Sequence, residues 1–225
     1  MRVVFYNYFQ ALLHPIKFNK YLREVREKVK NQSGYSQKLR IADDGETDPK
    51  ALGDMFRLNF FESLSISWGF VILQALYSYL GLWLGKYLMT YLGWGAGVGF
   101  SGKKYILIYE IGSVVIFPLL TLVYVKVWSY LIIFFGILYD KEEESSEVAN
   151  DIMTTSLSTY AFLAIPIMGE FIQKLSFIFY IFVGLKENMK LGNLQSFLVI
   201  LSPIILLFAS VVFFTSLFVA FIQSF

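Results

Sequence analysis

The chain of 225 residues contains no cysteine and a single histidine, His14. The absence of cysteine excludes disulfide bonds, thiol nucleophiles and thiolate metal ligands. Serine nucleophiles usually depend on a histidine base, and zinc sites usually need several histidine or cysteine ligands. One histidine supports neither, so we expect a protein that is not an enzyme and that uses no cofactor and no metal.

Charge is also scarce, because 16% of the residues are charged and 56% are hydrophobic. Soluble domains have about 25% charged and about 45–50% apolar residues. Residues 191–225 carry no charge at all. A helix of about 20 apolar residues crosses the hydrocarbon core of a bilayer. We therefore predict an all-α, multi-pass integral membrane protein whose first partner is the lipid bilayer.

The apolar segments predict a bundle of five transmembrane helices that occupies residues 63–225. We place the helices at about 63–85, 105–139, 150–165, 168–184 and 193–222. The third and fourth are separated at Pro166, because one helix over 152–182 would be too long for a single span. Pro118 leaves open whether 105–139 is one helix or two.

The N-terminal region, residues 1–62, is predicted to contain a basic amphipathic helix followed by an acidic linker. Apolar residues recur at three- and four-residue spacing, and lysines and arginines fill the other positions; the apolar residues are Phe18, Tyr21, Leu22, Val25 and Val29. This pattern favours a helix that lies in the membrane interface. The alternative is a helix that packs on the protein's own cytoplasmic face.

The distribution of positive charge predicts the orientation. Eleven of the 19 lysines and arginines lie in residues 1–62. The excess of positive charge on cytoplasmic segments therefore places the N-terminus in the cytoplasm, at the cell inner membrane if the chain is prokaryotic. The net charge of +2 is small, and no basic stripe with aromatic residues for base stacking stands out, so we expect no binding to nucleic acid.

Four charged residues interrupt the apolar segments and are the candidate functional residues: Glu110, Lys126, Glu170 and Lys174. Charged side chains at membrane depth commonly mark transport paths. Alternatively, Glu110 and Lys126 extend to the interface. Glu170 and Lys174 have the i,i+4 spacing of a helical ion pair, so they can satisfy each other.

Several short motifs together resemble the Yip family, the Ypt/Rab-interacting membrane proteins, and in particular its short prokaryotic members. They are the segments around Pro15, Pro118, Pro166 with Gly169, and Gly184. The resemblance covers nearly the whole chain. It implies a five-helix domain with a cytoplasmic N-terminus and a role of the kind found in membrane trafficking.

Two functions follow from these patterns. The first is a scaffold that organises membrane or cytoplasmic proteins through a protein partner or a homo-oligomer. The second is a transporter, channel or permease subunit whose polar path passes near Glu110, Lys126, Glu170 and Lys174. A transporter requires a polar cavity at membrane depth, whereas a scaffold can have a packed bundle.

Overall fold

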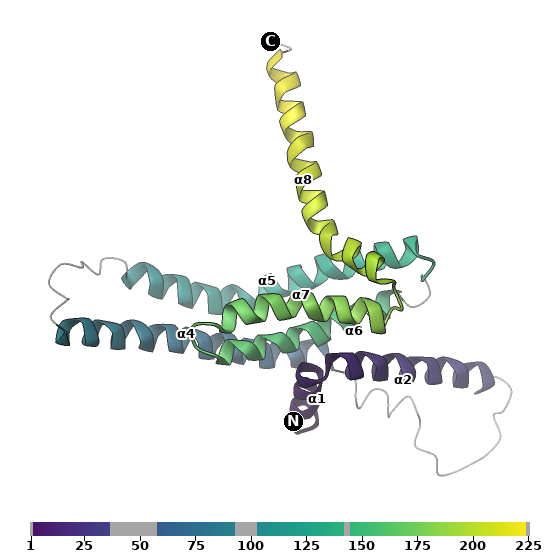
Figure 1. Ribbon diagram of the computed structural model, residues 1–225, viewed down its shortest axis with the longest axis horizontal. Coiled ribbons are helices and arrows are strands. Elements are labelled where there is room, and N and C mark those ends of the chain that lie inside the picture. The colour runs from purple at the N-terminus through teal and green to yellow at the C-terminus, as the bar shows by residue number, and fades with distance from the viewer. Residues whose placement is uncertain (1, 37–57, 93–102, 142–144, 224–225) are drawn as a thin grey trace.

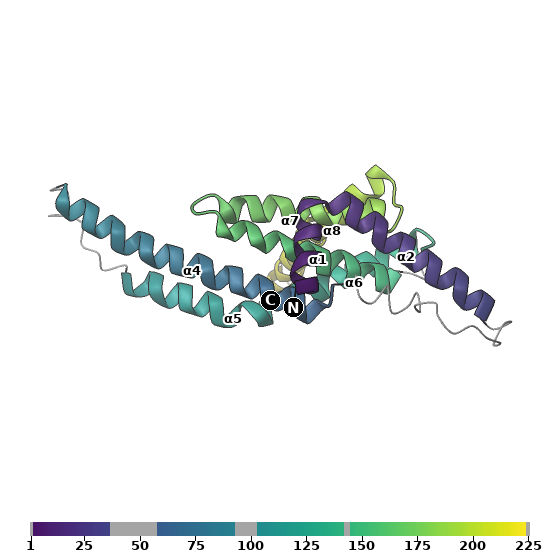
Figure 2. The same ribbon diagram turned by 90° about the horizontal axis from the view of Figure 1, so that it is seen from below.

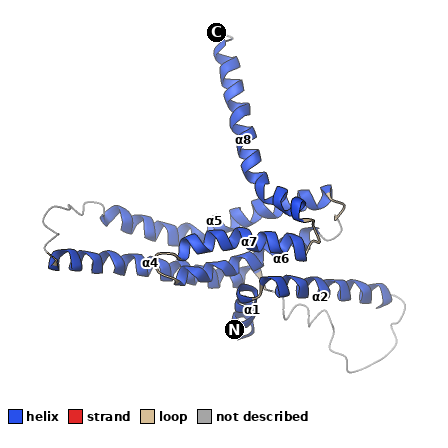
Figure 3. Ribbon diagram, viewed as in Figure 1, coloured by secondary structure: helices blue, strands red, loops and turns tan. Residues whose placement is uncertain are grey.

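The computed structural model describes residues 2–36, 58–92, 103–141 and 145–223, and these residues form helices and short connections without a strand. The predicted acidic linker lies largely outside the described residues. Figures 1 and 3 show an elongated bundle from which two helices diverge. A helix occupies each segment that the sequence predicted to be helical, although one of them changes its helix type.

Two helices form the N-terminal region, α1 (Arg2–Leu13) and α2 (Pro15–Ser36). Proline is favoured at the first position of a helix, where its missing N–H is not needed, and Pro15 starts α2 in this way. The two helices point in different directions (Figure 2). Helix α1 lies across the long axis of the bundle, and α2 runs roughly along that axis and extends beyond the bundle. The Tyr180 hydroxyl of α7 (Gly169–Glu187) donates to the Leu12 carbonyl and ties α1 to the bundle.

A long antiparallel pair, α4 (Phe60–Tyr91) and α5 (Lys103–Leu138), runs the length of the bundle. The side chain of Asn59 caps α4 by accepting from the Phe61 N–H at 3.1 Å. The Trp68 indole of α4 donates to the Val114 carbonyl of α5 at 2.8 Å. Pro118 lies inside α5, which continues through it as one helix, so residues 105–138 form one helix and not two.

The centre of the fold is a hairpin of α6 (Ser145–Ser156), the 3₁₀-helix η3 (Leu157–Ala164) and α7. The chain turns between Ala164 and Gly169, around Pro166 as predicted. Only glycine fits at position 169, because a Cβ there would overlap the Phe162 carbonyl oxygen. Hence residues 152–182 form two antiparallel limbs.

The helix predicted over 150–165 changes type along its length, and its second half is the 3₁₀-helix η3. A 3₁₀ stretch of eight residues is unusually long, because 3₁₀ runs rarely exceed three or four residues. Hydroxyl side chains donate to the carbonyls three residues earlier, Ser156 to Met153, Ser158 to Thr155 and Thr159 to Ser156. Such local bonds compete with regular α-helical geometry, and they cluster where the helix tightens.

The last helix, α8 (Asn193–Gln223), leaves the bundle near the end of α5 and projects away from it (Figure 1). Only its base packs: Ser196, Val199 and Ser202 are buried, whereas residues 204–222 are exposed. These exposed residues are nearly all apolar, which indicates hydrocarbon or another apolar surface around this helix.

Three of the described helices are long and apolar enough to cross a membrane, at Phe60–Leu88, Ile108–Leu138 and Asn193–Ile222. Their length and composition are consistent with an integral membrane protein. The α6–η3 limb and α7 are not among them. The count of five spans therefore stays a prediction.

The main core lies between α5, the central hairpin and the base of α8. Ile132, Ile152, Ile181, Leu185 and Val199 are fully buried there. Nine of the twelve residues of α6 are buried, so this helix is enclosed by protein on almost every side.

Candidate functional site: an ionic cluster between α2 and the α7–α8 turn

A buried ion pair fastens α2 to the central hairpin. Arg26 Nη2 lies 2.6 Å from Asp151 Oδ2 of α6, and the two side chains are 9% and 3% exposed. The same nitrogen donates to Asn188 Oδ1 at 3.0 Å, and Glu147 lies 3.8 Å from Arg26 Nε. Buried charges need such partners, because an isolated charge loses its hydration.

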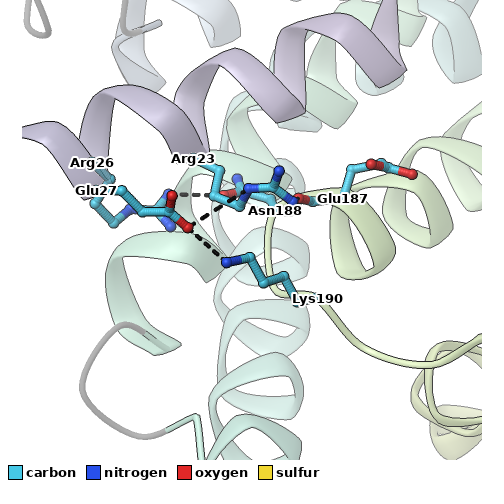
Figure 4. Close-up of polar contacts among 6 residues, drawn as sticks. All are labelled: Arg23, Arg26, Glu27, Glu187, Asn188 and Lys190. Atoms are coloured by element: carbon cyan, nitrogen blue, oxygen red, sulfur yellow. Dashed lines mark hydrogen bonds and ion pairs between the residues drawn. The ribbon is translucent and has the colours of Figure 1, made fainter.

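A second set of contacts joins α2 to the turn between α7 and α8, residues 188–192. Arg23 donates to the Glu187 carbonyl at 2.8 Å, and Lys190 donates to Glu27 Oε1 at 2.7 Å. Figure 4 shows Arg23 and Glu27 of α2 lying beside the end of α7 and beside Lys190 of the turn that follows it. We name this group of contacts the α2 cluster. Its members are Arg23, Arg26, Glu27, Asp151, Asn188 and Lys190, with the backbone carbonyl of Glu187.

Local structure explains why these residue types meet. Arg23, Arg26 and Glu27 share one face of α2 because they are three and four positions apart. The last carbonyls of a helix lack intrahelical partners and carry partial negative charge, which favours an arginine at the end of α7. Lys190 has a φ of 57°, a left-handed conformation that reverses the chain beside α2.

The charges of the α2 cluster support one another. The hydrogen bond from Lys190 is the main reason that the pKa of Glu27 is lowered from its ordinary value, and the positive charges of Lys190, Arg23 and Arg26 act in the same direction. Glu27 is consequently a carboxylate at neutral pH and pairs with Lys190.

A second polar contact, between α1, α4 and η3, lies deeper. Tyr8 is fully buried, and its hydroxyl donates to the Leu157 carbonyl at 3.0 Å. Ser67 Oγ lies 2.9 Å from the same carbonyl, and its one proton is shared between this carbonyl and that of Ser63 at 2.7 Å. Leu157 is the first residue of η3, where the helix type changes. Burial raises the pKa of Tyr8, so its hydroxyl stays protonated as a donor.

Part of the apolar stripe of α2 packs against the rest of the protein. Phe18 and Leu22 are buried in a cluster with Tyr8, Ala11, Leu58 and Ala161. The prediction that these two side chains contact lipid was wrong, and the alternative of packing on the protein holds for them. Tyr21 is exposed and Val25 is half-buried; the side chain of Val29 lies outside the described set.

The four charged candidates do not form one site. Glu170 and Lys174 pair with each other at 2.6 Å on the surface of α7, where their side chains are 58% and 69% exposed. Lys126 is exposed on α5. Glu110 borders an apolar groove between α4 and α5. Among the described residues, neither Lys126 nor Glu110 has an ion-pair partner.

The motifs behind the family resemblance occupy structural positions. Pro15 starts α2, Pro118 lies within α5, and Pro166 and Gly169 form the hairpin turn. Gly184 packs against Ile152, because a Cβ on Gly184 would lie 2.8 Å from two carbons of that side chain. These residues therefore act in packing and chain reversal.

Sequence reasoning missed the α2 cluster and helix α1. One signal for the cluster was Asp151, which directly precedes a long apolar segment. An acidic residue that is buried at such a place needs a cation as its partner. Arg23, Arg26 and Glu27 share a face of α2, but this face was expected to be solvated.

Metal ligation is not supported within the described ranges, where no group of three or more histidine, cysteine, aspartate or glutamate side chains could hold an ion. Comparison with known proteins found no family model, no curated protein and no solved structure that matches the chain.

Proposed function

We propose that the chain is a non-enzymatic integral membrane protein that organises other membrane or cytoplasmic proteins, in the manner that its resemblance to the Yip family implies. The observation that carries this proposal is the α2 cluster. The buried pair of Arg26 and Asp151 holds a basic helix in a fixed place on the transmembrane bundle.

A fixed helix suits a docking role. The face of α2 opposite the buried Phe18 and Leu22 is exposed and carries Lys17, Lys20, Glu24 and Lys28. A partner that binds a preordered helix avoids the entropy cost of ordering it. The mainly positive face favours an acidic partner surface, and complementary charge raises the rate of association.

The bilayer is the second proposed partner. Exposed apolar side chains cover the outer side of α1, among them Phe5, Tyr6 and Phe9. Aromatic residues on a short helix suit the membrane interface. In this placement α1 rests on the cytoplasmic leaflet, and the following helix α2 points into the cytoplasm.

The proposed topology has a cytoplasmic N-terminus, five spans and, in a prokaryote, a position in the inner membrane. Because α8 projects away from α4 and α5 (Figure 1), it must bend at its base, between Gly192 and Pro203, to cross the same bilayer as these two helices. Two features suit this bend: α8 is packed only at its base, and a proline inside a helix weakens the backbone hydrogen bonding there.

Purification of the full-length protein from its native membrane in mild detergent tests the docking role. A triple variant, Lys17→Glu with Lys20→Glu and Lys28→Glu, reverses the charge of the exposed α2 face. We expect specific co-purifying proteins with the wild type and their loss with this variant. The control is Lys86→Glu with Lys141→Glu, two exposed lysines elsewhere. Identical co-purifying proteins for all three would contradict the proposal.

The second candidate function is a transporter or channel subunit, which the position of Glu110 in the α4–α5 groove favours. Flux through proteoliposomes tests it. Loss of flux in Glu110→Gln, with full flux in Glu170→Ala, would support transport along this groove. No flux above that of empty liposomes, for ions or for organic cations, would exclude it.

A further inference from the structure

The groove between α4 and α5 has a volume of about 300 Å³. It is lined almost entirely by hydrocarbon side chains, and Glu110 is its one acidic residue. Ala75 lines the groove from α4, where its small side chain leaves room, while Ile111 and Val114 line it from α5.

The groove is fixed in shape and open at its side. The hydrogen bond from Trp68 to the Val114 carbonyl joins α4 to α5 beside it. Leu76, Tyr79 and Val115 line the groove and are also exposed. Because α4 and α5 each have the length and composition of a membrane span, an amphiphile can enter from the lipid.

Glu110 introduces a charge into this apolar setting. The residue is half-buried, and Ser113 donates to its backbone carbonyl and not to its carboxylate. No cationic side chain of the described residues pairs with the carboxylate. A carboxylate against hydrocarbon is unfavourable without a counter-charge. A ligand with one positive group would supply that counter-charge to Glu110.

We propose that this groove binds a single-chain cationic amphiphile, with its ammonium group at Glu110 and its hydrocarbon chain along Ala75 and Val114. The volume lies at the lower end of the range for small-molecule sites, about 300–1,000 Å³, which suits one chain and not two. The lining has no basic residue to receive a phosphate. The ligand is consequently an amphiphile with a single positive charge and not a zwitterionic lipid headgroup. This site is independent of the α2 cluster and of partner docking.

A second apolar groove provides a matched control. It lies between α1 and α4, has a volume of about 760 Å³ and also contains one carboxylate, Glu62. Glu62 lies in the first turn of α4, where the partial positive charge of the helix end favours an acidic side chain. Glu110 is seven residues from the start of α5 and has no such compensation.

The test uses the full-length protein in nanodiscs and measures equilibrium binding of radiolabelled dodecyltrimethylammonium, with empty nanodiscs as background. We expect saturable binding to the wild type that unlabelled dodecyltrimethylammonium displaces. Dodecyl maltoside, which has the same chain without charge, and lysophosphatidylcholine, which is zwitterionic, should displace it poorly.

Glu110→Gln should weaken binding at least about tenfold, because it removes the counter-charge and keeps the side-chain shape. Ala75→Leu should also weaken it by filling the groove, and Glu62→Gln should leave it unchanged. Four results would overturn the site: no saturable binding to the wild type, equal binding to Glu110→Gln, equal loss in Glu62→Gln, or equal displacement by lysophosphatidylcholine. Circular dichroism and gel filtration establish that each variant is folded.

Discussion

Arg26 and Asp151 are 125 positions apart in the sequence, and their side chains meet at 2.6 Å in a nearly buried setting. This contact connects the basic helix α2 to α6, nine of whose twelve residues are buried. It turns a basic segment that could have lain loosely on the membrane into a fixed part of the fold.

Removing one partner of this pair should destabilise the protein strongly. Arg26→Ala leaves Asp151 as a buried charge without its closest cation, and such changes cost about 3–5 kcal/mol. Unfolding of the detergent-solubilised protein measures this loss. The matched control is Lys174→Ala, which breaks an exposed pair of the same 2.6 Å separation and should cost about 0–1 kcal/mol. Similar losses for both variants would show that the buried pair has no special role.

Tyr8 and Ser67 should show non-additive effects, because their hydroxyls lie 3.0 Å apart and both approach the Leu157 carbonyl. Tyr8→Phe and Ser67→Ala each remove one donor and should each cost about 1 kcal/mol. Either single change also breaks the bond between the two hydroxyls, so the double variant should cost less than the sum of the two by about 0.5–1 kcal/mol. Denaturant unfolding of the four proteins measures the coupling, and strict additivity would contradict the shared contact.

The pairing of Glu27 with Lys190 should depend on pH. The pKa of Glu27 is lower in the fold than its ordinary value, so the pair contributes stability above the ordinary glutamate pKa of about 4.3. That contribution falls as the pH drops through the lowered pKa of the folded state. A spin-label distance between α2 and the α7–α8 turn, followed from pH 7 to pH 3, should broaden in the wild type.

Glu27→Gln is the control for this pH dependence, because glutamine does not titrate. The variant should show a broader distance distribution at pH 7 and a smaller change on acidification. An acid response identical to that of the wild type would contradict the role of the Glu27–Lys190 pair.

Gly184 should tolerate no larger residue. The added methyl group of Gly184→Ala would lie 2.8 Å from two carbons of Ile152, and overpacking of this kind costs about 1–3 kcal/mol. Gly81→Ala, where a Cβ meets nothing within 4 Å, should be neutral or stabilise the single chain by up to about 1 kcal/mol, because alanine favours the helix. Thermal unfolding in detergent separates the two, and equal melting temperatures would contradict the close packing of α7 on α6.

Local patterns in the sequence were sufficient to predict the helices other than α1 and the break at Pro166, because hydrophobic segment length and proline act locally. They were not sufficient for η3, since helix type there depends on hydroxyl groups that bond neighbouring carbonyls in a buried setting. The i,i+4 pair of Glu170 and Lys174 was also predictable, because the two residues share one turn of α7.

The α2 cluster was beyond sequence reasoning for a different reason. Arg26 reaches Asp151 and Asn188 only after α2 folds back on the hairpin, and no local pattern encodes that approach. The same folding covers Phe18 and Leu22 with protein, which reversed the expectation that they face lipid. Glu110 was recognised as unusual from the sequence, but its groove requires the pairing of α4 with α5.

The account depends most on the protein being built into a bilayer, and alkaline carbonate extraction of membranes from expressing cells tests this directly. The account predicts that the full-length chain remains in the membrane pellet at high pH and is released only by detergent. Recovery of the chain as a folded, monodisperse particle in detergent-free buffer would contradict it.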